Sequence, residues 1–224
     1  MLSDAEWSAV MLSLRVAVVC VAVMIVPSVT LAWVLARKQF WGKALLDAVV
    51  HAPLVLPPVV VGLLLLVLLG RRGPIGGPLY DWFGIEIAFT WWAAVIASGI
   101  MALPLMVRSA RLGFELADRR LDEASRTLGA PPWSTFRRVT LPLAMPGVLT
   151  GVVLGFARSL GEFGATIMFA GNIEGSTRTL PLAIFTESQT PGSDAALWRL
   201  VVIAAVLSLG SVLVSQWLVT RGRR

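Results

Sequence analysis

The sequence contains few of the residues on which disulfide-linked, metal-binding and soluble proteins depend. Only 14% of its 224 residues are charged, and it has one cysteine, one histidine and one tyrosine. A soluble globular protein carries about 25% charged residues. A single cysteine cannot form a disulfide framework, and one cysteine with one histidine cannot complete a Cys/His metal cluster. Cys20 lies in an apolar run, so we expect it to pack there, and we expect no metal site.

The sequence also lacks a nucleotide-binding loop and a recognisable catalytic set. A phosphate-binding loop needs the pattern G-x-x-x-x-G-K-[ST]. The chain has two lysines, Lys38 and Lys43; Gly42 precedes the second, but Ala44 follows it and the earlier glycine is missing. A single histidine leaves little for catalysis at membrane depth. We therefore predict a non-catalytic chain without cofactors of its own, in which any ATP and Mg²⁺ are bound by a partner.

Long apolar segments are abundant instead, since 57% of the residues are hydrophobic. A transmembrane helix needs about 20 mainly apolar residues to cross a hydrocarbon core of about 30 Å. The first apolar run is too long for a cleaved signal peptide. We predict an all-α polytopic membrane protein, a single transmembrane domain over residues 1–224. Its five predicted spans are Val10–Ala36, Ala44–Leu69, Trp91–Val107 with the uncharged stretch from Ile87, Leu143–Ala170 and Ala195–Val219.

The basic residues are distributed unequally between the two sides that five spans define. One side holds only Arg71, Arg72 and Arg178. Lysine and arginine are retained on the cytoplasmic side, so we predict an N-terminus outside and a C-terminus inside. This distribution explains the net charge of +6 without a nucleic-acid partner. The thirteen residues of the predicted cytoplasmic side are Arg37, Lys38, Lys43, Arg108, Arg111, Arg119, Arg120, Arg126, Arg137, Arg138, Arg221, Arg223 and Arg224.

The longest predicted cytoplasmic loop, residues 108–142, is expected to hold two short helices. Gly129 is placed to cap the first of them, and Pro131-Pro132 prevent its continuation. We expect Ser134 to cap the second helix and Glu123 to be exposed on the first. Taken alone, this pattern favours an ordinary amphipathic surface helix. The residues that share one face of the first helix at helical spacing are Leu121, Ala124, Thr127 and Leu128.

The spacing within this loop resembles the signature of ABC importer permeases. That signature is Glu-Ala-Ala, three residues, Gly, nine residues and Ile-x-Leu-Pro. Ser125 and Val139 depart from it by small conservative changes. The resemblance implies that the loop is a coupling helix docked in a groove of a separate ATPase subunit, a task that suits a short rigid helix. The positions of this chain that correspond to the signature are Glu123, Ala124, Ser125, Gly129, Val139, Leu141 and Pro142.

The fourth predicted span carries two charged residues, Arg158 and Glu162, four positions apart on one helical face. Charged side chains inside a membrane are costly and usually face a bundle interior or an aqueous path. The pair fixes helix packing, or it lines a translocation path in which Arg158 balances an anion and Glu162 prevents tight binding. Ser159 is placed to donate a hydrogen bond to an oxyanion. Small residues that allow close helix approach surround the pair: Gly155, Gly161 and Gly164.

The second predicted span contains residues that interrupt a helix, namely Pro53, Pro57, Pro58 and Gly62. Such breaks are tolerated in a membrane where neighbouring elements or an aqueous cavity satisfy the backbone. A plain kink and a gate-forming helix are the two interpretations. The candidate residues of a translocation path are therefore Pro57, Pro58, Arg158, Ser159 and Glu162.

Several stretches resemble ABC permeases for tetrahedral oxyanions. Residues 156–165 are similar to the same stretch of molybdate, tungstate and sulfate permeases, and residues 51–62, 70–73, 79–85 and 171–181 resemble molybdate permeases. The resemblance covers essentially the whole chain. It implies a type I ABC importer permease that moves molybdate by alternating access. Sulfate, thiosulfate and tungstate remain alternatives, because these dianions have similar shapes.

The resemblance also implies partners. These are a second copy of the chain in a homodimer, two cytoplasmic ABC ATPase subunits and a periplasmic molybdate-binding protein, in the lipid of a bacterial inner membrane. An ion-coupled secondary transporter acting alone is the alternative from another class. The sequence lacks the inverted repeats of many such transporters, and uptake driven by an ion gradient without ATP would favour that alternative.

Overall fold

The computed structural model describes the backbone of residues 2–221 and the side chains of residues 2–213; Arg223 and Arg224 of the predicted cytoplasmic tail lie outside it. All regular structure in the described range is helical. In chain order the elements are α1 (Asp4–Arg37), α2 (Lys43–Val55), α3 (Pro58–Leu69), α4 (Gly76–Phe83), α5 (Trp91–Leu116), α6 (Arg119–Thr127), α7 (Pro132–Thr135), the π-helical turn η1 (Phe136–Thr140), α8 (Leu141–Leu160), α9 (Gly164–Phe169), α10 (Leu180–Ser188) and α11 (Asp194–Arg221).

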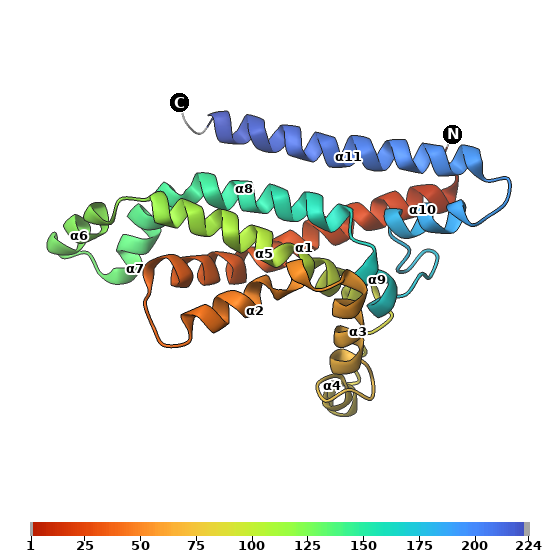
Figure 1. Ribbon diagram of the computed structural model, residues 1–224, viewed down its shortest axis with the longest axis horizontal. Helices are drawn as coiled ribbons and strands as arrows, with labels where there is room; N and C mark the ends of the chain where they lie inside the picture. Colours follow the sequence, from red (N-terminus) through yellow and green to blue (C-terminus); the bar gives the residue numbers. More distant parts are fainter. Residues whose placement is uncertain (1, 222–224) are drawn as a thin grey trace.

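The helices α1, α5 and α8 lie side by side as the core of the structure, and α5 packs against both of the others (Figure 1). Gly147, Gly151 and Gly155 of α8 face α5 at intervals of four residues. A Cβ atom at Gly147 would lie 2.7 Å from the carbonyl oxygen of Ser109, and one at Gly151 would lie 2.9 Å from that of Met106. This close approach of two backbones requires small residues, as in other membrane helix pairs.

Within the described residues, four helices are long and apolar enough to cross a membrane, and a fifth span is obtained when the bent pair α2 and α3 counts as one. The predicted span Ala44–Leu69 is thus divided into two helices that meet at an angle of 115°. The break falls at Leu56 and Pro57, and Pro58 opens α3. Proline has no N–H to donate to the preceding turn, so the helix ends there.

The bounds of two predicted segments, the fourth span and the loop before it, are wrong. The segment Leu143–Ala170 is not one helix, because α8 ends at Leu160 and α9 starts only at Gly164. Its beginning also lies earlier, since the helical segment runs from Pro132 through η1 into α8. The predicted loop 108–142 is shorter at both ends. The helix α5 continues to Leu116, and the helical segment after the loop begins at Pro132.

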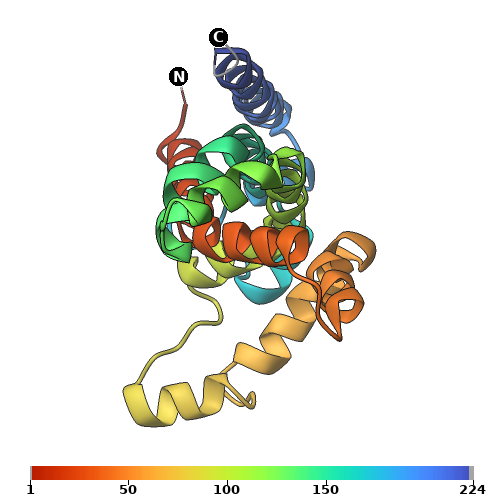
Figure 2. The same cartoon turned by 90° about the vertical axis from the view of Figure 1, so that its left-hand side faces the viewer.

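The helices α3 and α4 form an arm that stands away from the bundle (Figures 1 and 2). The base of the arm packs against α9, where a Cβ atom at Gly62 would lie 2.5 Å from the carbonyl oxygen of Ala165. Beyond this base, α3 exposes apolar side chains such as Leu64 and Val67. The start of α3, directly after the α2–α3 break, therefore lies beside α9.

Candidate coupling helix and translocation site

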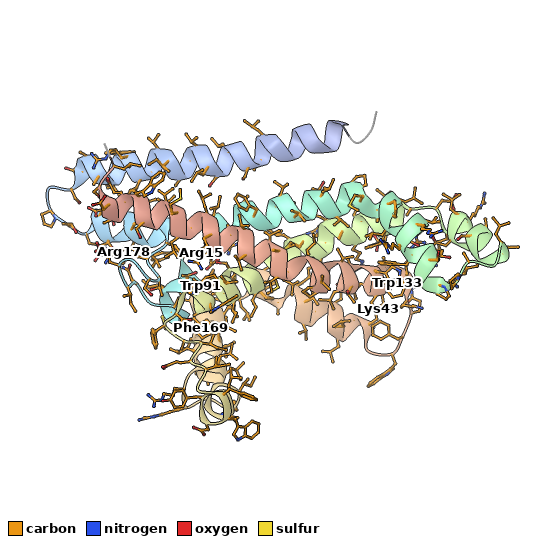
Figure 3. All side chains as sticks on the ribbon, turned by 180° about the vertical axis from the view of Figure 1, so that it is seen from behind. Arg15, Lys43, Trp91, Trp133, Phe169 and Arg178 are labelled. Carbon is orange, nitrogen blue, oxygen red and sulfur yellow. The ribbon has the colours of Figure 1, made fainter. Side chains whose placement is uncertain are left out.

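The helix α6 lies at one end of the bundle, the end at which Lys43 and Trp133 are found, whereas Arg178 lies at the opposite end (Figures 1 and 3). Gly129 has a φ of 86°. Its N–H and that of Ala130 donate to the carbonyl oxygens of Arg126 and Ser125, at 2.9 and 3.2 Å. These two bonds form a Schellman motif. The predicted glycine cap is confirmed, and α6 is a short helix that terminates itself.

The surface of α6 is available to a partner. None of its nine residues is buried, and both Glu123 and Ala124 are exposed. Leu121 is 48% exposed, and Leu128 just beyond the helix is 89% exposed. Exposed leucines beside a carboxylate on a short helix have the form that helix-in-groove recognition uses.

The remaining residues of the signature connect α6 to the start of α8. The hydroxyl oxygens of Ser125 and Thr135 lie 3.1 Å apart, within hydrogen-bond distance. Leu141 and Pro142 form the first turn of α8 and follow the turn η1 directly. The signature therefore spans the helix that faces outward and the beginning of the long helix behind it.

The cap of the second short helix differs from the prediction. Ser134 lies inside α7, whose N-cap is Pro131 and whose first residue is Pro132. Proline suits these positions, because its missing N–H has no partner in the first helical turn. The two prolines therefore start this helix as well as ending the loop.

Arg158 and Glu162 form the expected ion pair. Nη1 of Arg158 lies 2.7 Å from Oε2 of Glu162, and the two side chains are 27% and 1% exposed. Oε2 of Glu162 has no hydrogen-bond partner within the described residues, so the contact with Arg158 is an ion pair without a hydrogen bond. Loss of the arginine would leave a buried carboxylate without its counter-charge, which is costly.

Glu162 also determines how α9 begins. Its Oε1 accepts a hydrogen bond from the N–H of Ala165 at 2.8 Å, so the carboxylate satisfies one of the unpaired amide groups in the first turn of that helix. Ser159 lies nearby in sequence and is 5% exposed. Its hydroxyl oxygen is buried and has no nitrogen or oxygen hydrogen-bond partner within the described part of the chain, and the thiol of Cys20 on α1 lies within reach of it. A buried hydroxyl without a nitrogen or oxygen partner is rare.

The structure brings Pro58 close to the segment that carries Arg158 and Glu162. A Cβ atom at Gly164 would lie 2.8 Å from Cβ of Pro58, so the start of α3 touches the start of α9. Two interrupted helices therefore meet, α2–α3 and α8–α9, and Pro57 lies exposed at the bend of the first. Gly161, expected to allow close helix approach, meets only an atom of its own preceding turn.

The coupling residues and the path residues are not brought together. Glu123 lies on α6 at one end of the bundle, and Glu162 lies where α8 meets α9, far from that end and inward of α10 (Figure 1). Within the described residues, no group of three His, Cys, Asp or Glu side chains is placed to hold a metal ion. The arrangement provides one surface for a partner and one polar site deep in the bundle.

Two structural features were missed in the sequence analysis. The spacing Gly147, Gly151 and Gly155 is a repeated small-x-x-x-small pattern, which is a visible signal of close helix packing. The polar contacts of Asp122 with Arg37 and Thr140 join residues 85 and 18 positions apart, and no local pattern in the sequence indicates them.

These features define a class: a multi-pass helical membrane subunit with a short exposed helix at one end and a polar site within its bundle. A family model described as "Binding-protein-dependent transport system inner membrane component" matches residues 28–224. The chain belongs to this family. It is therefore a non-catalytic inner-membrane component of a transport system, as the sequence predicts.

Similar proteins agree with this assignment. The chain is 55% identical to the molybdenum transport system permease protein ModB of Escherichia coli K12, over 97% of this chain and 95% of that protein. It is 53% identical to ModB of Haemophilus influenzae, over 96% and 94% of the two chains. It is 40% identical to the sulfate transport system permease protein CysW of Synechocystis, over 90% and 74%.

Solved structures share the fold. A bacterial ABC transporter involved in alginate import superposes with a TM-score of 0.75 at 16% identity, over 98% of this chain and 80% of the other. The methionine ABC transporter MetNI in an inward-facing conformation gives a TM-score of 0.69 at 18% identity, over 98% and 95%. The predicted ABC importer permease fold is confirmed.

Proposed function

We propose that the chain is the transmembrane permease subunit of an ATP-binding-cassette importer that moves molybdate from the periplasm to the cytoplasm. The observation that carries this proposal is the 55% identity to the molybdenum transport permease ModB of Escherichia coli, which extends over 97% of the chain. The region compared spans 97% of the chain, and α6 and the Arg158–Glu162 site lie well inside the chain's ends. The chain itself forms no covalent bond with its cargo.

The proposed complex contains two copies of this chain, two cytoplasmic ATPase subunits and a periplasmic molybdate-binding protein. ATP and Mg²⁺ bind to the ATPase subunits, since the chain has no phosphate-binding loop of its own. The exposed face of α6 with Glu123 docks into the ATPase. Closure of the ATPases then moves the two permease copies as rigid bodies, opening a path between them outward, and hydrolysis resets it inward.

The N-terminus is proposed to face the periplasm and the C-terminus the cytoplasm. The arginines of α6 and the end of α5 support this orientation, because positive residues are retained on the cytoplasmic side. The docking helix has to reach a soluble ATPase, and it lies at the same end as these arginines.

The translocation path is proposed to pass the site at which α3 and α9 meet. A dianion there would interact with the part of the Arg158 guanidinium that Glu162 leaves exposed. We expect the hydroxyl of Ser159 to supply one hydrogen bond to the anion. Glu162 keeps the local charge near neutral, so that an anion passes without being trapped. Pro57 and Pro58 fix the bend that places α3 beside this site.

A sulfate permease is the second candidate, and the 40% identity to the sulfate permease CysW of Synechocystis supports it. Sulfate and molybdate are both tetrahedral dianions, so charge alone does not separate them. The higher identity to the molybdenum permeases favours molybdate.

Uptake of radiolabelled molybdate at nanomolar concentration, in cells with and without this gene, tests the proposal. We expect uptake to be lost on deletion and to be little affected by excess sulfate. Unchanged molybdate uptake after deletion, or strong competition by sulfate, would contradict the proposal and favour the sulfate permease.

A further inference from the structure

Three polar residues from three different elements meet behind the coupling helix. Thr140 of η1 donates a hydrogen bond to Oδ1 of Asp122 in α6 at 2.8 Å. The other carboxylate oxygen of Asp122 lies 3.8 Å from Nη2 of Arg37 at the end of α1. We call Arg37, Asp122 and Thr140 the anchor. It joins α6 to α1 and to the turn that leads into α8.

The anchor is reinforced by two contacts between helix ends. Arg37 donates through Nη2 to the carbonyl oxygen of Ala117, the C-cap residue of α5, at 2.9 Å. Arg119, the first residue of α6, donates to the carbonyl oxygen of Ala36 in α1 at 3.3 Å. Cationic side chains at helix carboxyl ends are stabilising. Hydrogen bonds therefore connect the end of α1 with the end of α5 and with the start of α6.

The anchor is enclosed, in contrast to the docking face. Thr140 is 3% exposed, and the side chains of Arg37 and Asp122 are 9% and 21% exposed. A cavity of about 210 Å³ lies beside it, lined also by Trp33 and Phe136. Asp122 thus faces inward, whereas its neighbour Glu123 is exposed.

An aromatic cluster fixes the same junction. Phe136 of η1 lies 5.6 Å from the ring of Trp33 in α1, 5.7 Å from that of Trp133 and 6.3 Å from that of Phe114 in α5. Aromatic pairs at these separations are attractive. A π-helical turn inside a longer helix often marks a functional position, and this one places Thr140 beside Asp122.

We propose that Asp122 is the positioning residue through which α6 moves the membrane helices. Displacement of α6 by the ATPase is transmitted through Asp122 to Arg37 of α1 and to Thr140 at the foot of α8. The far end of α8 holds Arg158. In this proposal Glu123 contacts the ATPase, and Asp122 transmits the displacement of α6 to α1 and α8. This inference rests on the proposed function, because it needs α6 to be the docking helix.

The test compares purified permease–ATPase complexes in proteoliposomes, measuring molybdate uptake and ATP hydrolysis on the same sample. For Asp122→Ala we expect the ATPase to co-purify and ATP hydrolysis to stay within about twofold of the unmodified complex, while uptake per ATP falls at least fivefold. Thr140→Val should lower the same ratio, and the double variant should be no worse than Asp122→Ala. Asp122→Asn, which keeps an acceptor for Thr140, should give an intermediate ratio. Asp81→Ala on α4 is the matched control.

The outcomes separate this inference from the proposed function. An unmodified complex that takes up no molybdate would contradict the proposed function. If the unmodified complex transports and Asp122→Ala transports equally well per ATP, the anchor inference alone is overturned. It is also overturned if Asp122→Ala loses the ATPase subunit, or if hydrolysis and uptake fall in parallel, because Asp122 would then serve docking or folding.

Discussion

Arg158 and Glu162 differ in the contacts that their side chains make. Glu162 pairs with the arginine through one carboxylate oxygen and holds the first turn of α9 through the other. Within the described residues Arg158 has no such second attachment, and 27% of its side chain is exposed. The carboxylate is therefore the structural member of the pair, and the arginine is the member available to an anion.

Replacement of Arg158 distinguishes a packing role from a path role. Arg158→Ala should lower molybdate uptake at least tenfold while the protein remains in the membrane, as measured by uptake and by quantifying the protein in membrane fractions. The double variant Arg158→Ala with Glu162→Gln removes the uncompensated buried charge. If the pair only fixes packing, the double variant should recover uptake; if Arg158 lines the path, it should stay inactive. Recovery would contradict the path proposal.

At the scale of elements, local signals in the sequence were sufficient for α6 and insufficient for the breaks. The helix α6 was predictable because its cap, Gly129, acts within one turn. The end of α8 was not, because the N-terminus of α9 is satisfied by Glu162, and this depends on a conformation that the apolar pattern does not encode. The 115° bend at Leu56 and Pro57 depends on α9 as well as on proline, since Gly62 packs against it.

The candidate site was predicted only in part, because some of its contacts are local in the sequence and others join distant segments. The contact between Arg158 and Glu162 follows from their spacing on one helix, so the sequence was enough. The approach of Pro58 to Gly164 joins elements about a hundred residues apart, and only the tertiary packing determines it. The roles of these residues in transport stay predictions.

The cap of α6 gives a test at the element scale. Gly129→Val should destabilise the loop, because a left-handed conformation costs an L-residue roughly 1–2 kcal/mol and more for a β-branched side chain. Gly129→Asn should be better tolerated, since asparagine visits this conformation. Binding of the purified ATPase subunit to each variant should weaken more for valine. Equal weakening by both substitutions would contradict the account.

The contact between α5 and α8 gives a second test. Gly147→Ala places a Cβ atom within 2.7 Å of backbone, and overpacking of this kind costs about 1–3 kcal/mol. Gly210→Ala on α11 is the matched control, because a Cβ atom there meets nothing within 4 Å. Thermal unfolding in detergent should shift downward for the first variant and not for the second. Equal shifts would show that the glycine row does not set the helix separation.

At the scale of the whole molecule, the docking helix and the polar site are connected by the length of α8. Its 20 residues extend about 30 Å, which is long enough for the proposed coupling between α6 and the Arg158–Glu162 site. The family and the shared fold make the chain an inner-membrane transport component. Its direction in the membrane, its dimer and its cargo are the proposals that experiments on whole cells and complexes can test.

Cysteine labelling tests the orientation. The natural cysteine, Cys20, is buried and gives little background. Gln39→Cys, in the exposed turn after α1, should react with a membrane-impermeant maleimide only after cells are opened. Glu174→Cys should react in intact cells. Reversed labelling would contradict a periplasmic N-terminus.

The most direct test of the central claim is molybdate accumulation by the purified complex in proteoliposomes, with the binding protein and molybdate outside and ATP supplied to the ATPase side. We predict uptake that requires ATP and is abolished by Glu123→Arg, because reversal of charge on α6 removes the docking contact. Uptake that proceeds on an ion gradient without ATP, or at full rate with Glu123→Arg, would contradict an ATP-driven importer coupled through this helix.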